Sequence, residues 1–250
     1  MQLVDNSDSL GDHNAKAALF DVLGEVAGAL SAGRRVEIID LLAQGERPVE
    51  EIAGEIGQSM ANASHHLRVL ARAGLVRTRR DGTHIYYRLS GPEVEDLWAA
   101  LRLVSETVRD DLERLAVAYL GESIEVEVLD RTELLTRLSD GSVTVIDVRP
   151  PAEYRAGHVP GARSVPLAVL AQMLGEFPEN LTVVAYCRGP YCVFAPAAVR
   201  LLSQHGITAL RLKEGFPEWR RAGLPIATGD EPGQIISNTP SSRFINDHQS

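Results

Sequence analysis

Cysteine, lysine and long apolar runs are scarce in this 250-residue chain. Its two cysteines both lie within residues 187–192, too few and too close to make the disulfide framework of a secreted domain. No stretch approaches the roughly 18 apolar residues of a membrane span, and the acidic, polar start MQLVDNSDSLGDHN differs from a secretory signal. The sequence therefore predicts a cytoplasmic protein with no membrane partner.

Lysine occurs only as Lys16 and Lys213, so nearly all positive charge is arginine, which suits bidentate contacts to phosphate or guanine. A GC-rich source genome would enrich arginine equally well. The net charge of −9 argues against a nucleic-acid partner, but residues 58–88 hold six arginines against the single acid Asp81. Residues 58–88 therefore form a basic patch in spite of the negative total charge.

Hydrophobic periodicity divides the chain into two domains. It predicts helices over residues 14–30, 34–43, 48–56, 60–73 and 93–119, and strands over 75–78 and 84–89 around a turn at Asp81-Gly82. Further strands are expected near 124–129, 143–148, 182–186 and 209–212, alternating with helices at 131–138, 167–174, 192–205 and 217–222. This order predicts a flexible N-terminus (1–13), a mainly α winged helix-turn-helix domain (14–120), a linker (121–123), an α/β domain with a parallel sheet (124–229) and a disordered tail (230–250).

Both cysteines lie in one loop, Cys187-Arg-Gly-Pro-Tyr-Cys192, between a predicted strand and a predicted helix. Such a loop points backbone N–H groups at its first residue, and the helix N-terminus adds about half a positive charge. We expect these groups to lower the pKa of the Cys187 thiol below about 8.5 and to give a nucleophilic thiolate. The alternative is that the cysteines are small buried hydrophobes.

Three separated segments, YCRGPYC, IDVRPPAEYRAGHVPGARSVP and EGFPEWRRAGLPI, resemble the active-site loop and the two signature segments of the rhodanese family of sulfurtransferases. The resemblance covers about residues 124–229 and implies that Cys187 carries a persulfide during sulfur transfer. The candidate loop residues are Cys187, Arg188, Gly189, Tyr191 and Cys192. Four residues of the first signature segment are expected to hold loops together rather than to transfer protons: Asp147, Arg149, Glu153 and His158.

The loop departs from the family at its sixth position, where many active rhodaneses carry an arginine and this chain has Cys192. The missing cation weakens binding of an anion such as thiosulfate, although Arg188 could supply part of it. A persulfide on Cys187 could instead be attacked by Cys192, which releases hydrosulfide and leaves a disulfide. Rhodanese-fold phosphatases and arsenate reductases have a loop one residue longer that ends in arginine, and Val193 at that place disfavours their chemistry.

The N-terminal half carries a second resemblance. Residues 29–90, and most specifically SHHLRVLARAGLV followed by a hairpin, resemble the ArsR/SmtB family of bacterial repressors over about residues 15–118. The second helix of such a motif lies in the major groove of DNA. The expected contact set on this helix is Ser59, Met60, Asn62, Ala63, Ser64, His65, His66 and Arg68, with Asn62 and His65 on bases and Ser64 and Arg68 on phosphates. The expected wing contacts are Arg77, Arg79, Arg80 and His84.

No metal or cofactor is expected. The family's cysteine metal site would fall where this chain has Pro48, Val49 and Glu50, and the predicted helix 93–119 lacks the histidine of its other site. Adjacent His65 and His66 point about 100° apart on a helix and do not chelate together.

These observations predict a homodimeric repressor that binds a near-palindromic operator and detects reactive sulfur, or another small thiol-reactive species, through Cys187 and Cys192. The predicted helices 14–30 and 93–119 would form the dimer interface. One alternative is an active sulfurtransferase whose DNA-binding half regulates its own synthesis. Another is a repressor that captures arsenite or a similar soft ion with the two thiols.

Overall fold

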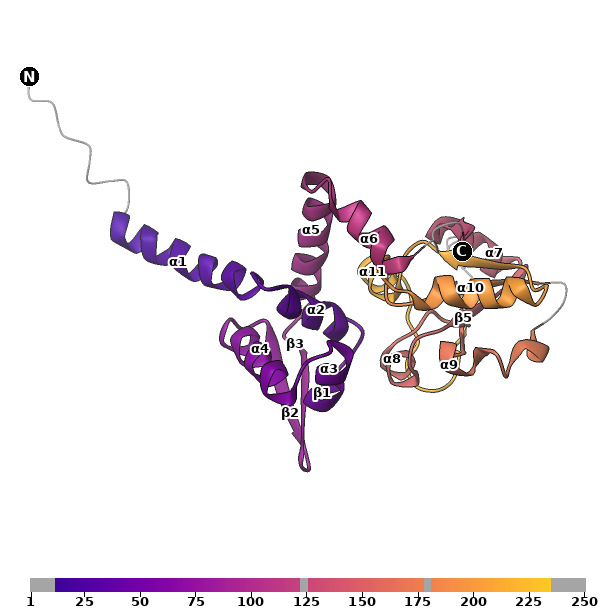
Figure 1. The fold of residues 1–250 in the computed structure, drawn as a ribbon, viewed down its shortest axis with the longest axis horizontal. Coiled ribbons are helices and arrows are strands. Elements are labelled where there is room, and N and C mark those ends of the chain that lie inside the picture. Colours follow the sequence, from indigo (N-terminus) through magenta and orange to yellow (C-terminus); the bar gives the residue numbers. More distant parts are fainter. Residues whose placement is uncertain (1–11, 122–125, 178–180, 235–250) are drawn as a thin grey trace, which may run out of the picture. The chain divides into compact units, whose positions relative to one another are not determined.

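The computed structural model describes residues 12–121, 126–177 and 181–234, and the chain divides into two compact units between Glu113 and Arg114 (Figure 1). Most of the predicted flexible N-terminus (1–13), linker (121–123) and disordered tail (230–250) lies outside the described residues, as does the start of the strand predicted at 124–129.

The first unit combines helices with a small antiparallel sheet. Its elements are α1 (His13–Ala29), α2 (Gly33–Leu42), β1 (Arg47–Pro48), α3 (Val49–Glu55), α4 (Met60–Arg72), β2 (Val76–Asp81), β3 (His84–Leu89) and α5 (Pro92–Val108). The strands lie in the order β1-β3-β2. The helix pair α3–α4 followed by the β2–β3 hairpin is the predicted winged helix-turn-helix, and Figure 1 shows the hairpin extending beyond these helices.

Local sequence signals set the ends of these elements. Ser59 caps α4 by accepting a hydrogen bond from the Asn62 amide at 3.2 Å, and Gly74 follows the helix with a φ of 75°. In the hairpin, Asp81 pairs with His84, so the turn consists of Gly82 and Thr83. Gly82 adopts a φ of 59°, as such a two-residue turn requires, and the turn lies one residue later than predicted.

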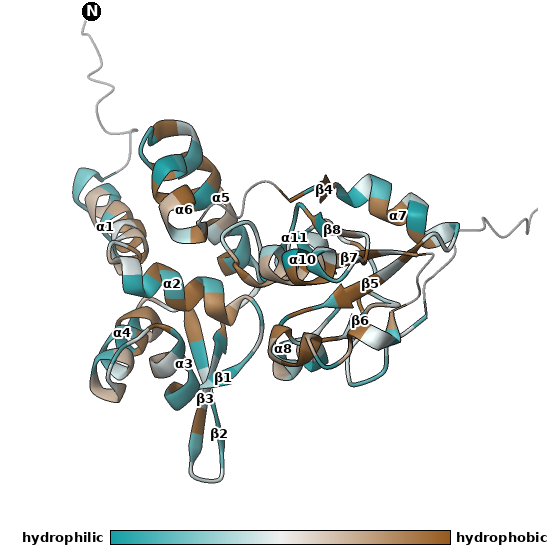
Figure 2. Cartoon of the chain, turned by 45° about the vertical axis from the view of Figure 1, so that its right-hand side comes forward, coloured by the Kyte–Doolittle hydropathy of each residue, from teal (hydrophilic) through white to brown (hydrophobic). Residues whose placement is uncertain are grey.

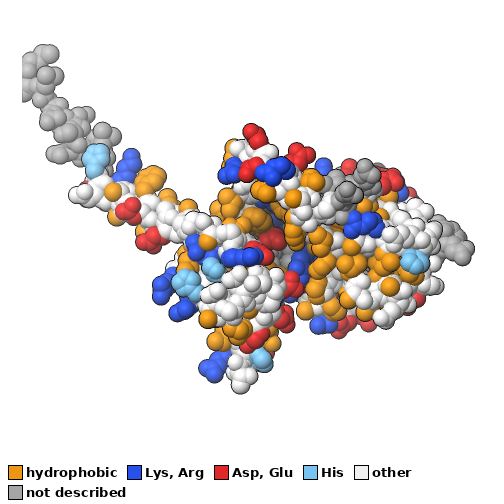
Figure 3. Space-filling model, viewed as in Figure 1, with side chains coloured by type: hydrophobic (Ala, Val, Ile, Leu, Met, Phe, Trp, Pro, Cys, Tyr) orange, Lys and Arg blue, Asp and Glu red, His pale blue; other side chains and the backbone are white. Residues whose placement is uncertain are grey.

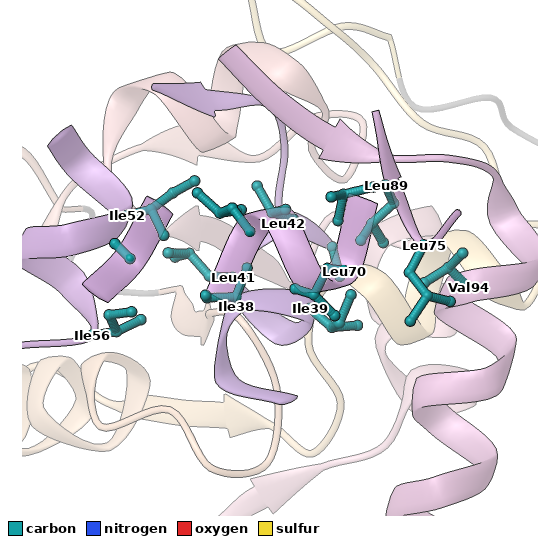
Figure 4. Close-up of a cluster of buried hydrophobic side chains, with 14 of the residues drawn as sticks. Ile38, Ile39, Leu41, Leu42, Ile52, Ile56, Leu70, Leu75, Leu89 and Val94 are labelled. Atoms are coloured by element: carbon teal, nitrogen blue, oxygen red, sulfur yellow. The ribbon is translucent and has the colours of Figure 1, made fainter. Parts of the chain in front are cut away.

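A single apolar core holds the first unit together (Figure 4). Ile38 and Ile39 of α2, Ile52 of α3 and Leu67 and Leu70 of α4 are each at most 1% exposed. Truncating one such side chain to alanine costs about 2–5 kcal/mol of stability. The core therefore fixes the orientation of α4, whose outer face remains available.

Two sequence predictions are corrected in this half of the chain. The single helix expected over 93–119 is two helices, α5 and α6 (Leu112–Leu120), because the backbone at Arg109 leaves the helical region with φ −118° and ψ 99°. The Arg109 guanidinium binds Asp111 at 2.9 Å across this break, and aspartate favours helix starts over helix interiors. Pro48, expected inside the first turn of α3, caps that helix in an extended conformation and pairs with Tyr86.

The second unit is built around a five-stranded sheet. Besides α6, its elements are β4 (Val128–Leu129), α7 (Arg131–Ser139), β5 (Val143–Asp147), α8 (Pro151–Ala156), β6 (Arg163–Ser164), α9 (Leu167–Leu170), the short 3₁₀ helix η2 (Leu174–Glu176), β7 (Thr182–Tyr186), α10 (Phe194–Gln204), β8 (Ala209–Leu212) and α11 (Phe216–Arg221). The strand order is β4-β8-β7-β5-β6, and every pairing is parallel. The predicted fold class is confirmed.

The central strands are buried on both faces, as their continuous apolar sequences require (Figure 2). Along β7, Val183 and Ala185 belong to one core cluster, which includes α10, whereas Val184 and Tyr186 belong to the other, which includes Phe216 and Trp219 of α11. The sheet therefore has a hydrophobic layer on each side. Its parallel strands bring the segments that follow β5, β7 and β8 to one edge.

Candidate functional site

The loop that carries both cysteines begins directly after β7 and leads into α10. The Cys192 amide donates to the Gly189 carbonyl at 3.1 Å, which closes the turn, and Gly189 has a φ of 150° that suits glycine. The Phe216 amide donates to the Cys187 carbonyl at 3.0 Å, so the start of α11 holds the first residue of the loop. Tyr191 lies half-buried in the same turn.

Gly215 makes this attachment possible. A side-chain carbon at position 215 would collide with the backbone of Arg188 and Gly189. The close approach fixes the path of the dithiol loop against the segment that follows β8. Any larger residue at position 215 would push the loop away from α11.

The two sulfur atoms are buried and interact. Cys187 is 3% exposed and Cys192 9% exposed, and the Cys187 Sγ lies 3.8 Å from the carbonyl oxygens of Gly189 and Cys192. Burial raises the pKa of the Cys187 thiol well above its usual range, and the neighbouring Cys192 raises it further. The pKa of the Cys192 thiol is lowered, mainly because Cys187 donates a hydrogen bond to it, and further by the Phe194 and Arg188 amides and the Arg188 charge.

The predicted low pKa of Cys187 is therefore wrong, because desolvation and the second sulfur outweigh the N–H groups that face it. Of the two thiols, Cys192 is therefore the one whose ionisation its surroundings favour.

Arg188 points its guanidinium at Glu153. Its Nε and Nη2 atoms lie 2.9 and 2.6 Å from the Glu153 Oε1, and the guanidinium also stacks over the Phe194 ring at 5.2 Å. The Glu153 side chain is 1% exposed, and that of Arg188 is 14% exposed. The positive charge nearest the dithiol is thus held by a buried carboxylate.

The other residues of the first signature segment form a buried network beside this pair. Arg149 binds Asp147 through two guanidinium nitrogens, at 2.9 and 2.6 Å, and donates to the Gly157 carbonyl at 2.7 Å. The Tyr186 hydroxyl donates to Asp147 at 2.6 Å. His158 is fully buried, with its ring nitrogens 2.9 and 3.0 Å from the carbonyl oxygens of Tyr154 and Glu231. These contacts bind the loop after β5 to the sheet and to the segment after α11.

The outer face of α4 presents most of the residues predicted to contact DNA. Ser59, Met60, Asn62, His65 and Arg68 are exposed, and Ser64 and His66 are half-buried. Burial lowers the pKa of His66, and the charge of Arg35 lowers it further, which favours the neutral ring. Ala63 is fully buried in the core, so its inclusion in the contact set is wrong. The period of the helix places Ala63 on the same face as Leu67 and Leu70.

The hairpin presents Arg77, Arg79, Arg80 and His84, all of which are exposed. Arg79 is held by two carboxylates, Glu46 at 2.6 Å and Asp81 at 3.1 Å, and stacks over Tyr86 at 4.7 Å. The Arg80 Nε donates to the Gly82 carbonyl at 3.2 Å, at the tip of the hairpin. The predicted wing arginines therefore differ in how their charge is compensated.

Comparison with known proteins identifies the family. A model described as "Bacterial regulatory protein, arsR family" matches residues 33–78, and a model described as "Rhodanese-like domain" matches residues 130–222. The chain is 46% identical over 223 residues to the HTH-type transcriptional regulator Rv0324 of Mycobacterium tuberculosis, a match that covers 89% of this chain and 98% of that protein. The chain belongs to the arsR family of transcriptional regulators. It is an arsR-family regulator with a rhodanese-like domain.

Each half of this arsR-family regulator also has relatives of its own. A sulfurtransferase of Allochromatium vinosum is 33% identical over 102 residues, which are 40% of this chain and 94% of that one. A solution structure of the homodimeric winged helix-turn-helix DNA-binding domain Mb0332 of Mycobacterium bovis is 44% identical, covers 40% of this chain and 94% of its own, and superimposes with a TM-score of 0.38.

Two residues at the candidate sites of the arsR-family regulator were not predicted from the sequence. Glu46, which binds Arg79, precedes the two-residue strand β1, and only the pairing of β1 with β3 brings it to the wing. Gly215 lies within the segment EGFPEWRRAGLPI, but its role against the loop depends on β8 lying next to β7. In both cases the residue type is informative, since Glu46 is an acid near a basic patch and Gly215 is a glycine in a signature segment. The sequence does not show which residues Glu46 and Gly215 contact.

Among residues 12–121, 126–177 and 181–234 of the regulator, no group of three or more His, Cys, Asp or Glu side chains is arranged to hold a metal ion. Within the same described ranges, no helix combines the length and apolarity needed to span a membrane.

Proposed function

We propose that this chain is a homodimeric repressor whose affinity for its operator changes when reactive sulfur oxidises Cys187 and Cys192 to a disulfide. The observation that carries the proposal is the pair of buried cysteines in one short loop between β7 and α10, where the Cys187 Sγ lies 3.8 Å from the Cys192 carbonyl oxygen. A buried pair with one stabilised negative charge suits thiol–disulfide chemistry better than a single inert cysteine does.

The proposed reaction uses both sulfurs in sequence. The Cys192 thiolate takes the proton of Cys187, and the Cys187 sulfur attacks the outer sulfur of a persulfide RS–SH. The RS–SH bond breaks, RS⁻ leaves, and Cys187 carries –S–SH. Cys192 then loses its proton and attacks the inner sulfur of Cys187, so the Cys187–Cys192 bond forms and HS⁻ leaves. The dithiol is oxidised by two electrons, and the transferred sulfur is reduced to hydrosulfide.

The DNA contacts in this proposal come from α4 and the wing. Asn62 and His65 are exposed on the N-terminal half of α4, where a recognition helix reaches base edges. Arg68, Arg77 and Arg80 would neutralise phosphates on either side. In a two-fold dimer, the two α4 helices would read half-sites about one turn of DNA apart.

The proposed dimer interface is the apolar surface of α1 and α5. On α1, Leu19, Phe20, Val22 and Leu23 are 58–61% exposed, and Figure 3 shows hydrophobic side chains on the surface of this helix. On α5, Leu103, Val104 and Val108 are 55–65% exposed. So many large exposed apolar side chains on two helices of one unit favour a second copy of the chain as the partner that buries them.

The proposal is tested by measuring operator affinity for defined oxidation states of the full chain. The operator is first selected from random DNA with the reduced protein. Binding is then followed by fluorescence anisotropy for the reduced protein and for protein treated with polysulfide, and intact mass identifies the product on the loop. We expect treated wild-type protein to change affinity and the Cys187→Ser variant to be indifferent. Equal affinity of the reduced and disulfide forms would overturn the sensor.

A second candidate function is sulfur transfer itself, favoured by the 33% identity to a sulfurtransferase. In that case the persulfide on Cys187 would pass to an acceptor thiol before Cys192 could react. Catalytic turnover of sulfur donor and acceptor, with operator affinity unchanged throughout, would favour the enzyme over the sensor.

A further inference from the structure

We propose that the Glu153–Arg188 ion pair makes the dithiol selective for uncharged sulfur donors and excludes anionic ones such as thiosulfate. The inference rests on the proposed function of the dithiol and names its substrate class. It concerns Glu153, which the sequence placed only among the residues that hold loops together.

The charged side chains around the sulfurs form two ion pairs. The buried charged side chains beside the loop are Asp147 and Glu153, which are acidic, and Arg149 and Arg188, which are basic. Arg149 is bound to Asp147 at 2.6 Å, and Arg188 is bound to Glu153 at 2.6 Å. Both arginines beside the loop are therefore already neutralised by carboxylates before a sulfur donor enters.

The backbone N–H groups could otherwise bind an anion at the start of α10. The amides of Arg188 and Phe194 face the Cys192 sulfur, and those of Gly189 and Ala195 face the Cys187 sulfur. These donors already stabilise the sulfurs, so an entering anion would have to displace them.

The Arg188 guanidinium is enclosed by an aromatic ring and a carboxylate. One face of it stacks over Phe194, and its Nε and Nη2 atoms both bind one oxygen of Glu153. Because both arginines beside the loop are bound to carboxylates, a dianion entering this site of low exposure loses hydration without gaining a cation, a penalty that a neutral molecule avoids. An organic trisulfide or an uncharged persulfide has no such penalty.

The chemistry for a neutral trisulfide RS–S–SR is balanced without a further reagent. The Cys187 sulfur attacks an outer sulfur of the trisulfide, the bond to the central sulfur breaks, and RSS⁻ leaves. Cys192 then attacks the Cys187 sulfur and displaces RS⁻. The net products are the Cys187–Cys192 disulfide, RSSH and RSH.

The test compares two probes on the full chain, dimethyl trisulfide and thiosulfate, by counting the alkylatable thiols that remain over time. We expect wild-type protein to lose both thiols faster with the trisulfide. In the Glu153→Gln variant, Arg188 keeps its charge but loses the Glu153 carboxylate, and the rate ratio of thiosulfate to trisulfide should rise about tenfold or more. The double variant Glu153→Gln/Arg188→Gln restores the charge balance and should return the ratio to the wild-type value.

The Arg188→Gln variant gives an independent measurement if the Glu153 variants do not fold. It removes the closer of the two cations near Glu153, leaving Arg149 at 4.0 Å, so the same ratio should fall about tenfold. A merely structural role of the ion pair would slow both probes together and leave the ratio unchanged, which would overturn the proposal. Equal reactivity of wild-type protein with both probes would also overturn it. Reaction of the wild type with neither probe would instead refute the proposed function of the dithiol.

Discussion

Arg79 on the wing is bound to Glu46 on the segment before β1, at 2.6 Å between Nη2 and Oε1. This ion pair compensates one of the wing cations, whereas Arg80 extends to the hairpin tip and contacts the Gly82 carbonyl. The two neighbouring arginines therefore have different capacities to bind a phosphate.

The first prediction follows from this difference. Arg80→Ala should weaken binding to all DNA sequences and flatten the dependence of log K on log salt by about one phosphate contact, a slope change of roughly 0.9. Arg79→Ala should change the slope less, because Glu46 already holds its charge. Glu46→Gln removes one of the two carboxylates that hold Arg79, leaves Asp81 at 3.1 Å, and should steepen the slope by less than one phosphate contact. DNA affinity measured over a range of salt concentrations gives these slopes. Equal slopes for the two alanine variants would contradict the conclusion that Glu46 compensates the charge of Arg79.

The second prediction concerns base recognition by α4. Asn62→Ala should reduce discrimination between operator and mutated half-sites by about 1–3 kcal/mol, because an amide side chain on a base edge is lost. Its stability should stay near that of the wild type, since Asn62 is exposed. Leu67→Ala is the contrasting variant: it should lower the free energy of unfolding by about 2–5 kcal/mol. Unaltered specificity of the Asn62 variant would remove this residue from the base contacts.

The third prediction is a pH dependence of the dithiol. Because the pKa of Cys192 is lowered from 9.0, its alkylation should begin at a lower pH than that of a free thiol. Cys187→Ala removes the S–H donor, the largest cause of the shift, and should move the midpoint upward. The stability that this ionisation contributes is present above the unfolded-state pKa and is lost as the pH falls through the folded-state pKa. Alkylation rates from pH 6 to 10 measure both effects, and identical midpoints would exclude the hydrogen bond.

The fourth prediction tests the dimer. Replacing Leu19 and Leu23 of α1 by glutamate should convert the full chain to monomers in sedimentation experiments, because charges would then lie in the proposed apolar interface. Leu135→Glu, on an α7 residue of 40% exposure, is the matched control and should leave the assembly unchanged. We also expect a fragment of residues 1–120 to dimerise and bind the operator. A folded but monomeric fragment would contradict the interface.

The fifth prediction separates buried from exposed ion pairs. Asp147→Asn leaves Arg149 buried without its carboxylate and should cost about 3–5 kcal/mol in urea unfolding. Glu176→Gln breaks the exposed pair with Arg163 and should cost less than about 1 kcal/mol. Comparable losses in the two variants would show that Asp147 does not hold the loop after β5.

The sequence predicted those elements whose pattern is local and continuous. Residues 182–186 and 209–212 are strands with the predicted bounds, because short apolar runs between turns have few alternatives. The two-residue strands β1 and β6 have no periodic signature, so they were missed. The helix predicted over 93–119 is too long, because the helical spacing of apolar residues continues on both sides of the break at Arg109 and does not reveal it.

The candidate site was predictable in its residues but not in its electrostatics. The loop sequence located both cysteines and the helix that follows them. It could not show that desolvation outweighs the N–H groups at Cys187, or that a residue of the first signature segment compensates Arg188, because both depend on packing between distant segments. Ala63 was misplaced for a simpler reason, since the contact set took residues from more than one face of the helix.

The short loop that holds both cysteines has a consequence for a paired regulator. A disulfide between Cys187 and Cys192 closes within one chain, so each chain of a dimer is oxidised independently of the other. Such a dimer passes through a half-oxidised species in which one DNA-binding domain is altered and the other is unaltered. Occupancy of the operator would then follow the sulfur dose in two steps, with a defined intermediate between full and lost repression.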